Sequence, residues 1–202
     1  MYQLIGKINI MQSQEFSTRD LKSIKNSSVV HKRHLVLHEK YQKNPATAWI
    51  TDSAEVNGIN LQDPFRTKVS INNEMKVPFR IGVHKAVGGD HDFPNPGDLL
   101  CASLASCFES TVRMISNKLG IELFETKVRA TAQVDVRGTL MIDKSVPVGF
   151  QSMHIDVLII AKNTNEKLLH KLIEGAKRSC IVYQTIKKGI PITLNADVKI
   201  KN

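Results

Sequence analysis

Hydrophobic positions recur at helical spacing across the middle of the chain. The apolar positions three or four residues apart are Leu100, Leu104, Phe108, Val112 and Ile115. Asn95 is a suitable N-cap, Pro96 suits the first helical position, and Gly120 favours a left-handed stop. Small residues form a second surface: Ala102, Ser103, Ala105 and Ser106. Because a helix that is apolar on more than one side is usually central to its domain, the pattern predicts one long buried helix ending at Gly120.

Two further helices are predicted on either side of this one. After the capping cluster at residues 163–165, apolar residues at helical spacing continue through Cys180 and Tyr183, and Gly189 and Pro191 end this second long helix. A more polar helix is expected from Thr18 to about Lys43, where the following Asn-Pro pair stops it.

Alternation of apolar and polar residues predicts strands in the rest of the chain. The predicted strands span residues 2–10, 46–51, 65–71, 77–83, 127–136, 150–161 and 192–200. Residues 52–62, 72–73 and 137–149 have the composition of turns and loops. Runs of strands separated by two long helices indicate an α+β fold with antiparallel sheets.

Composition places the chain among ordinary globular proteins. Its 202 residues, 42% hydrophobic and 23% charged, suit one large domain with a proper core. No run approaches the ~20 continuous apolar residues of a membrane span, and the first residues lack the pattern of a signal peptide. We therefore expect a cytoplasmic protein that does not cross a membrane.

The net charge of +9 raises the question of nucleic acid binding. The basic residues are spread along the chain, with one denser run between Lys22 and Lys43, and aromatic content is only 5%, thin for base stacking. A solvated basic surface is favoured over nucleic acid binding. Attraction of an anionic substrate or an acidic partner is the alternative.

Two of the three cysteines lie on apolar stripes of the two long helices. If these helices pack together, Cys107 and Cys180 can meet, and one thiolate could reduce a peroxide while the other closes a disulfide. The alternative is that both are buried thiols that pack as small hydrophobes. Cys107 lies too far along its helix for the N-terminal dipole to help it. Cys101 points ~120° away from Cys107 and is expected to pack.

Other chemistry has weaker support. His84, His91 or His154 could serve Cys107 as a base in a hydrolase-like pair. The chain lacks Cys-x-x-Cys and His-Glu-x-x-His spacings, so no metal is expected. Gly88-Gly89 lacks the other glycines of a dinucleotide-binding loop, and no cofactor is expected.

The cysteine segments carry a resemblance to a known family. The segment Asn95-Pro-Gly-Asp-Leu-Leu, followed by Ala-Ser-Leu-Ala-Ser-Cys107 and Thr111-Val-Arg113, resembles the first-cysteine helix of the osmotically inducible protein C and organic hydroperoxide resistance (OsmC/Ohr) family. Ser179-Cys180-Ile-Val-Tyr-Gln-Thr resembles its second-cysteine motif, and two segments from Arg137 and Val146 resemble the stretch between. The resemblance covers about residues 41–200, which predicts an OsmC-like domain at 41–202 after an N-terminal extension at 1–40.

The resemblance implies a fold and an activity. The fold would be an intertwined homodimer, with two central helices wrapped by antiparallel sheets and the cysteines at the subunit interface. Cys107 would be the peroxidatic and Cys180 the resolving cysteine of a stress-response peroxidase that reduces organic hydroperoxides with a dithiol reductant. The alternative is a non-catalytic or redox-sensing homodimer that binds a small hydrophobic ligand in the same pocket.

The sequence departs from the family at three places. Gly97 stands where the hydroperoxide-resistance branch often has Glu, with Asp98 as the next residue, and Ile181 stands where many members have Pro. The N-terminal motif that carries the family's activating arginine has no clear match, which leaves Arg66 and Arg80 as candidates. Polar residues on the central helix complete the supporting candidates: Asp98, Glu109 and Arg113, the last two spaced as an ion pair.

Overall fold

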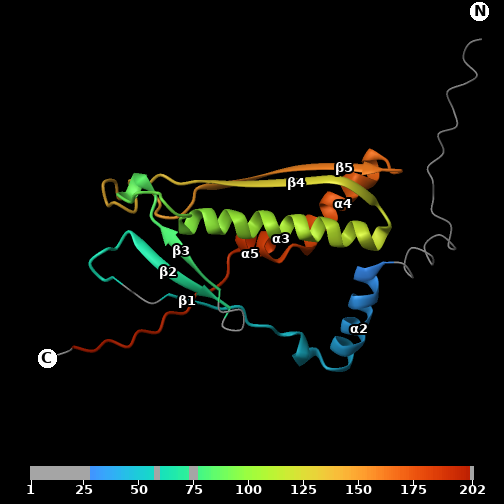
Figure 1. The fold of residues 1–202 in the computed structure, drawn as a ribbon, viewed down its shortest axis with the longest axis horizontal. Coiled ribbons are helices and arrows are strands. Elements are labelled where there is room, and N and C mark those ends of the chain that lie inside the picture. The colour runs from blue at the N-terminus through green and yellow to red at the C-terminus, as the bar shows by residue number, and fades with distance from the viewer. Residues whose placement is uncertain (1–27, 57–59, 73–76, 201–202) are drawn as a thin grey trace, which may run out of the picture.

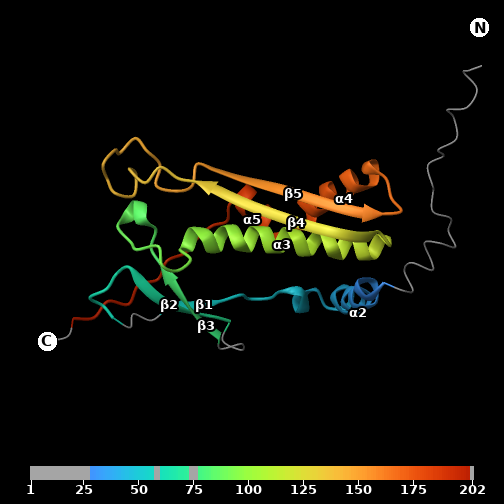
Figure 2. The same cartoon turned by 45° about the horizontal axis from the view of Figure 1, so that its top comes forward.

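The computed structural model of the chain describes residues 28–56, 60–72 and 77–200 (Figure 1). A long helix, α3 (Pro96–Leu119), runs along a two-stranded antiparallel sheet made of β4 (Glu122–Gln133) and β5 (Ser152–Lys162). A second sheet of three strands lies near the N-terminal end of α3 (Figure 2). This mixed arrangement of helices with antiparallel sheets confirms the α+β fold class.

The ends of α3 follow from its capping residues. The Asn95 side chain accepts hydrogen bonds from the backbone N–H groups of Gly97 and Asp98, and Asp98 Oδ2 accepts from Asn95 N at 2.9 Å. This reciprocal capping box satisfies N–H groups that no helical carbonyl can reach. At the other end, Gly120 has a φ of 69°, a conformation that glycine adopts without steric cost. Both predicted ends of the central helix are confirmed.

The β4–β5 sheet turns one face toward the helices. Alternate residues of β5 pack against the helical core: Ile155, Val157, Ile159 and Ala161. The sequence placed β4 at residues 127–136, but the strand begins earlier and ends at Gln133. It ends there because Gln151 Oε1 accepts from Asp135 N at 2.7 Å, so a side chain replaces the next rung of the ladder. The loop at residues 137–149 agrees with the prediction.

The second long helix was predicted as continuous, and this is wrong. It is divided into α4 (Glu166–Ser179) and α5 (Ile181–Lys188), with Cys180 in an extended conformation between them. Cys180 N still donates to Ala176 O, whereas the Cys180 sulfur accepts from Tyr183 N and so caps α5. Gln184 Nε2 donates to Lys177 O at 2.6 Å, which satisfies a carbonyl that the break leaves open.

The three-stranded sheet has the order β1 (Ala54–Val56), β2 (Arg66–Ile71), β3 (Val77–Gly82), all antiparallel. The strands predicted at 65–71 and 77–83 are confirmed, while β1 lies in a segment expected to be only turns. The strand predicted at 46–51 is wrong, because residues 45–48 form a short 3₁₀ helix that begins with proline. Thr47 Oγ1 donates to Asn44 O and stabilises that turn. The strand predicted at 2–10 lies outside the described residues.

Helix α2 (Val29–Lys43) forms the C-terminal part of the helix predicted from Thr18, and residues 18–27 lie outside the described part of the chain. The side chain of Asn117, on α3, caps the first turn of α2. The Asn117 Oδ1 atom accepts from Ser28 Oγ at 2.8 Å and from Val30 N at 3.1 Å. A residue 87 positions away thus supplies part of the cap of α2.

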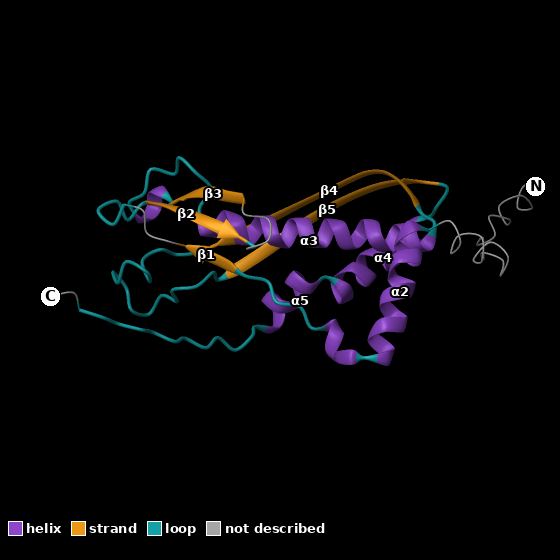
Figure 3. Cartoon of the chain, turned by 60° about the horizontal axis from the view of Figure 1, so that its bottom comes forward, coloured by secondary structure: helices purple, strands orange, loops and turns teal. Residues whose placement is uncertain are grey.

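The segment after α5 was predicted to be a strand at 192–200, and this is wrong for the described chain. Residues 189–200 have no regular secondary structure and lead away from the helices (Figure 3). Ile192, Leu194 and Ile200 are each 87–90% exposed. A strand needs a neighbouring edge for its backbone groups, and this segment pairs with none of the described strands. None of the described helices is long and apolar enough to cross a membrane.

Candidate active site

A pair of thiols lies where α3 meets the break between α4 and α5. Cys107 is near the middle of α3, and Cys180 is the residue between the two shorter helices. The Cys180 thiol donates a hydrogen bond to Cys107 Sγ, with the two sulfur atoms 3.3 Å apart. The expectation that these two cysteines meet is confirmed, and a small movement would bring the sulfurs to the ~2.05 Å of a disulfide bond.

The two sulfurs differ in their surroundings. Cys180 has no exposed surface and lies in the core with Phe108, Leu172 and Ala176, whereas Cys107 is partly exposed. Burial raises the pKa of the Cys180 thiol because a thiolate would lose its hydration there. The hydrogen bond from Tyr183 N to the Cys180 sulfur, at 3.4 Å, acts in the opposite direction. The reduced pair is therefore asymmetric, with Cys180 as the proton donor.

An apolar cavity of about 390 Å³ lies among α3, β5, α4 and α5, and neither Cys107 nor Cys180 lines it. It shares Phe108 and Tyr183 with the packing around the two cysteines. The remaining apolar lining residues are Leu104, Met153, Ile155, Val157, Ile173 and Ile186. His154, Lys177 and Lys187 are its polar lining residues. The cavity has the size and character of a site for a small, largely apolar molecule.

The arginines proposed as activators are occupied elsewhere. Arg66 donates to Asp92 at 2.8 Å and also contacts Asp63 and Asp90, and these carboxylates raise its pKa further above the usual range. The group ties β2 to the loop that leads into α3. The Arg80 guanidinium stacks over the Phe93 ring, 5.4 Å from its centroid. Both arginines therefore have structural partners. Among the described residues, no hydrogen bond or ion pair joins either arginine to Cys107 or Cys180, so their role as activating cations stays a prediction.

The polar candidates on α3 face away from the thiol pair. Asp98 belongs to the capping box, about 13 Å along the helix from Cys107 at 1.5 Å per residue. Glu109 lies ~200° around the helix from Cys107. Its Oε1 accepts from Thr126 Oγ1 of β4 at 2.6 Å and from Arg113 Nε at 2.7 Å, and these bonds hold the pKa of Glu109 below its usual range. The hydrogen bond from Thr126 joins α3 to the sheet, and the Arg113 ion pair holds Glu109 in place for it.

The histidines do not form the hydrolase-like pair considered above. His84 and His91 contact each other, with ring centroids 4.6 Å apart, and His154 Nε2 lies 3.1 Å from Asp156 Oδ1. Within the described ranges, no hydrogen bond joins a histidine to Cys107, and no group of three ligating side chains could hold a metal ion.

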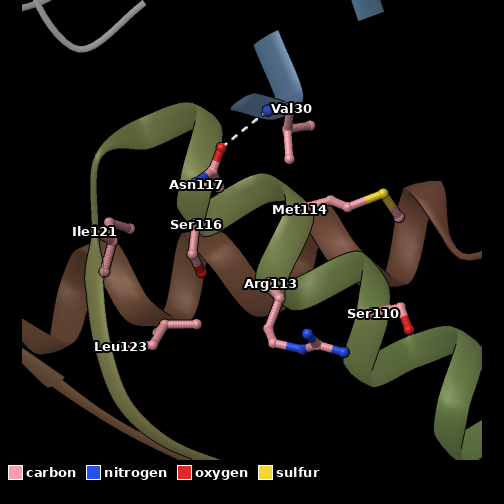
Figure 4. A pocket seen from close by; sticks show the side chains of 8 residues that line it. All are labelled: Val30, Ser110, Arg113, Met114, Ser116, Asn117, Ile121 and Leu123. Carbon is pink, nitrogen blue, oxygen red and sulfur yellow. Dashed lines mark hydrogen bonds between the residues drawn. The ribbon is translucent and has the colours of Figure 1, made fainter. Parts of the chain in front are cut away.

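Cys101 stands apart from the pair, as its helical position predicted. It lines a different cavity of about 820 Å³ at the start of α3, together with Asn95 and Asp98. Burial raises the pKa of the Cys101 thiol, and the Asp98 carboxylate adds to the effect. A third cavity, of about 430 Å³, lies between α2 and the C-terminal half of α3 and is lined by Val30, Arg113 and Asn117 among others (Figure 4).

Sequence reasoning missed the contribution of the α4–α5 junction. Tyr183 N, whose hydrogen bond reaches the Cys180 sulfur, comes from the backbone, and no residue type marks it. The single signal was Ile181, at a position where the resembling family often has proline, since proline favours the first position of a helix. The junction could have been inferred from that correspondence.

The fold and the thiol pair together define a class: an α+β protein in which a partly exposed thiol on a long helix meets a buried thiol at a helix junction. The chain belongs to the OsmC-like protein family, whose model matches residues 89–195. This confirms the resemblance seen in the cysteine segments. A relative in Bacillus subtilis, the uncharacterized protein YmaD, is 23% identical over 123 residues, which are 59% of this chain and 78% of that protein.

Solved structures share the fold at low identity. An OsmC-like protein of unknown function from Vibrio cholerae has a TM-score of 0.56 and 11% identity, covering 68% of this chain and 94% of its own. An OsmC-like protein from Mycoplasma pneumoniae has a TM-score of 0.55 and 12% identity, with coverages of 69% and 89%. An organic hydroperoxide resistance protein from Legionella pneumophila has a TM-score of 0.52 and 17% identity, with coverages of 68% and 90%. These similarities establish an OsmC-like fold.

Proposed function

We propose that this protein is a thiol-dependent peroxidase that reduces organic hydroperoxides through Cys107 and Cys180 as part of a stress response. The observation that carries this proposal is the 3.3 Å separation between the sulfur atoms of a partly exposed cysteine and a fully buried one. A peroxide must reach the first sulfur, while the second must only reach the first. The membership of the OsmC-like family, which includes organic hydroperoxide resistance proteins, supports the same activity.

The cycle has three steps. The Cys107 thiolate attacks the terminal oxygen of ROOH, the O–O bond breaks, and the alkoxide takes a proton to leave as an alcohol, which converts Cys107 to a sulfenic acid. The Cys180 sulfur then attacks the sulfenic sulfur, so that water leaves and a disulfide forms. A dithiol reductant returns both cysteines to thiols and becomes a disulfide itself.

The apolar cavity that shares Phe108 and Tyr183 with the packing around the pair supports a preference for organic over inorganic peroxides. Its lining is mostly apolar, so the alkyl group of a hydroperoxide gains from leaving water there, by about 25 cal/mol for each Å² buried. Hydrogen peroxide has no such group. We therefore expect a higher kcat/KM for cumene or tert-butyl hydroperoxide than for hydrogen peroxide.

The working form that we propose is a cytoplasmic homodimer. Large apolar side chains are exposed in two segments without regular strand structure: Trp49, Ile50, Ile192, Leu194, Val198 and Ile200. Contiguous exposed apolar surface marks an interaction site in most proteins. These two exposed segments, one between α2 and β1 and the other after α5, support an intertwined dimer in which the partner covers them.

Consumption of cumene hydroperoxide with a dithiol reductant tests the activity. The wild type and Cys101→Ser should turn over, whereas Cys107→Ser should lose turnover by at least about a thousandfold. Cys180→Ser should consume one equivalent of peroxide and accumulate a sulfenic acid on Cys107 that dimedone labels. Labelling of Cys180 in Cys107→Ser at the same rate would show that the assigned roles are wrong.

A binding or redox-sensing homodimer is the second candidate, and the apolar cavity favours it. In that case the wild type would consume no peroxide with any dithiol, yet a small apolar molecule such as an alkyl alcohol would raise its melting temperature. Leu104→Trp, which would fill part of the cavity, should then remove the ligand-induced shift.

A further inference from the structure

The break between α4 and α5 places the Cys180 sulfur at the beginning of a helix. Cys180 is the N-cap of the eight-residue helix α5, and Tyr183 N donates to its sulfur at 3.4 Å. The first N–H groups of a helix carry partial positive charge and stabilise an anion at this position. Cys107, by contrast, lies near the middle of α3, beyond the reach of that helix's N-terminal charge.

The cysteine at the helix N-terminus is the less accessible of the two. Cys180 is 0% exposed and packs among Phe108, Leu172 and Ala176, so an external thiol has no path to its sulfur. Cys107 is partly exposed. Thiol–disulfide exchange requires the attacking thiolate to touch one sulfur while the other leaves, and it proceeds fastest when the leaving thiolate is stabilised.

Access selects the direction of attack, because only Cys107 is open to an external thiol. The Tyr183 N–H offsets part of the cost that burial adds to a Cys180 thiolate. We propose that the reductant opens the Cys107–Cys180 disulfide by attacking Cys107 Sγ, with Cys180 as the leaving thiolate at the N-terminus of α5. The inference rests on the proposed function only in taking the disulfide as an intermediate. It adds the identity of the attacked atom and gives the Tyr183 backbone N–H a positioning role.

The atoms and electrons balance in two exchanges. The first thiolate of the dithiol forms a bond to Cys107 Sγ as the Cys107–Cys180 bond breaks, and Cys180 takes the electron pair. The second thiol of the reductant then attacks its own bonded sulfur and releases the Cys107 thiolate. The reductant loses two electrons and becomes a disulfide, its two protons passing to the solvent or to the protein thiols. Because burial raises the pKa of Cys180, its thiolate takes up a proton and again becomes the donor to Cys107.

Mapping the mixed disulfide on the wild-type protein tests the direction. The disulfide is made with diamide, which needs no peroxidase activity, and is then treated briefly with 2-mercaptoethanol, quenched in acid and alkylated with N-ethylmaleimide. Peptide mass spectrometry should find mercaptoethanol on Cys107 and maleimide on Cys180, at least about tenfold over the reverse pattern. Equal amounts, the reverse pattern, or failure of diamide to form the disulfide would overturn the proposal. Loss of peroxide turnover alone would instead count against the proposed function.

Removal of the hydrogen-bond donor tests the leaving group. Tyr183→Pro removes the backbone N–H in the first turn of α5, while Tyr183→Leu also loses the ring but keeps the N–H. Reduction of the diamide-formed disulfide by 2-mercaptoethanol should be about fivefold to tenfold slower in Tyr183→Pro than in Tyr183→Leu. Equal rates in two variants with matching circular dichroism would show that the N–H plays no part. If Tyr183→Pro does not fold, the wild-type mapping decides alone.

Discussion

At the scale of single residues, rotation around α3 decides which side chains reach the thiol pair. Cys107 faces the junction of α4 and α5, where it meets Cys180. Glu109, only two residues further, faces Thr126 on β4. The same ~100° step per residue thus sends one side chain to the site and another to the sheet. A polar residue close to a cysteine in sequence need not be close to it in space.

The first prediction separates a structural from a catalytic role for the Glu109–Arg113 pair. Glu109→Gln should keep the peroxide rate of the wild type but lower the free energy of unfolding by up to about 1 kcal/mol at pH 7, because Arg113 is largely exposed and the pair is screened. Since the folded-state pKa of Glu109 is depressed, this contribution is present above its usual pKa and is lost as the pH falls through the folded value.

Urea unfolding of both proteins between pH 7 and pH 3 measures the difference. The two curves should converge at the acidic end. Arg113→Met is the matched control, because it removes the other member of the pair and should give a loss of similar size. A large fall in the peroxide rate in either variant would show that the pair takes part in the chemistry.

At the scale of elements, the backbone conformation at the α4–α5 junction is the one that a following proline would favour. Cys180 has φ −73° and ψ 114°, which is the conformation that a residue before proline prefers. Ile181 is the first residue of α5, where a missing N–H costs nothing. The junction is therefore already shaped for the proline that this chain lacks.

The second prediction follows from that geometry. Ile181→Pro should leave the free energy of unfolding unchanged or raise it by up to about 1 kcal/mol, because proline restricts the unfolded chain. The melting temperature should stay the same or rise accordingly. Gln184→Pro is the control: Gln184 N donates to Cys180 O at 3.0 Å, and losing that bond inside α5 should cost about 3 kcal/mol. Thermal unfolding monitored by circular dichroism compares them. A marked loss in Ile181→Pro would mean that the junction differs from the one described.

The third prediction concerns the docking of α2 on α3. Partial burial lowers the pKa of His34, and Lys118 on α3, together with His38 and His31 on α2, lowers it further. A histidine with a depressed folded-state pKa binds protons more readily when unfolded. The docking should therefore be strongest above the usual histidine pKa of about 6.5 and weaken as the pH falls through the folded value.

Amide hydrogen exchange in α2, corrected for the intrinsic effect of pH, should report lower protection at pH 5.5 than at pH 7.5. His34→Gln should reduce this difference, because glutamine does not titrate. Unchanged protection in the wild type between the two pH values would contradict the prediction.

At the scale of the whole molecule, the chain leaves apolar surface that it does not cover by itself. The residues after α5 alternate apolar and polar side chains and are exposed from Ile190 to Ile200. A sequence patterned for a strand is thus present but pairs with neither of the described sheets. Another subunit could supply the missing edge.

The fourth prediction is that the protein is a homodimer burying more than about 2,000 Å² of total surface, as obligate interfaces do. Removal of residues 190–202 should weaken the dimer at least tenfold in sedimentation equilibrium. A matched control replaces only Lys199 and Lys201 by Ser and should dimerise normally. A stable, folded monomer of the full chain on dilution would refute the prediction.

The sequence alone determined those features whose causes are local. Asn95, Asp98 and Gly120 set the ends of α3 through bonds within a few residues, so the helix was predicted to the residue. The strict alternation of half-buried and exposed residues in β5 predicted a strand with one face on the core, and that face packs against the helices. The cysteine segments identified the family because they combine residue types at spacings that short motifs seldom share.

Only the tertiary structure decided the features that depend on distant partners. Arg66 looked like a candidate activator until the fold brought it to Asp90 and Asp92, more than twenty positions away. The helix through Cys180 has an unbroken helical pattern, yet it divides where the sulfur caps α5 and meets Cys107. Residues 192–200 have the pattern of a strand, but a strand exists only beside another edge. Spacing along a chain specifies which face a side chain takes, whereas the identity of its neighbour depends on how the elements pack.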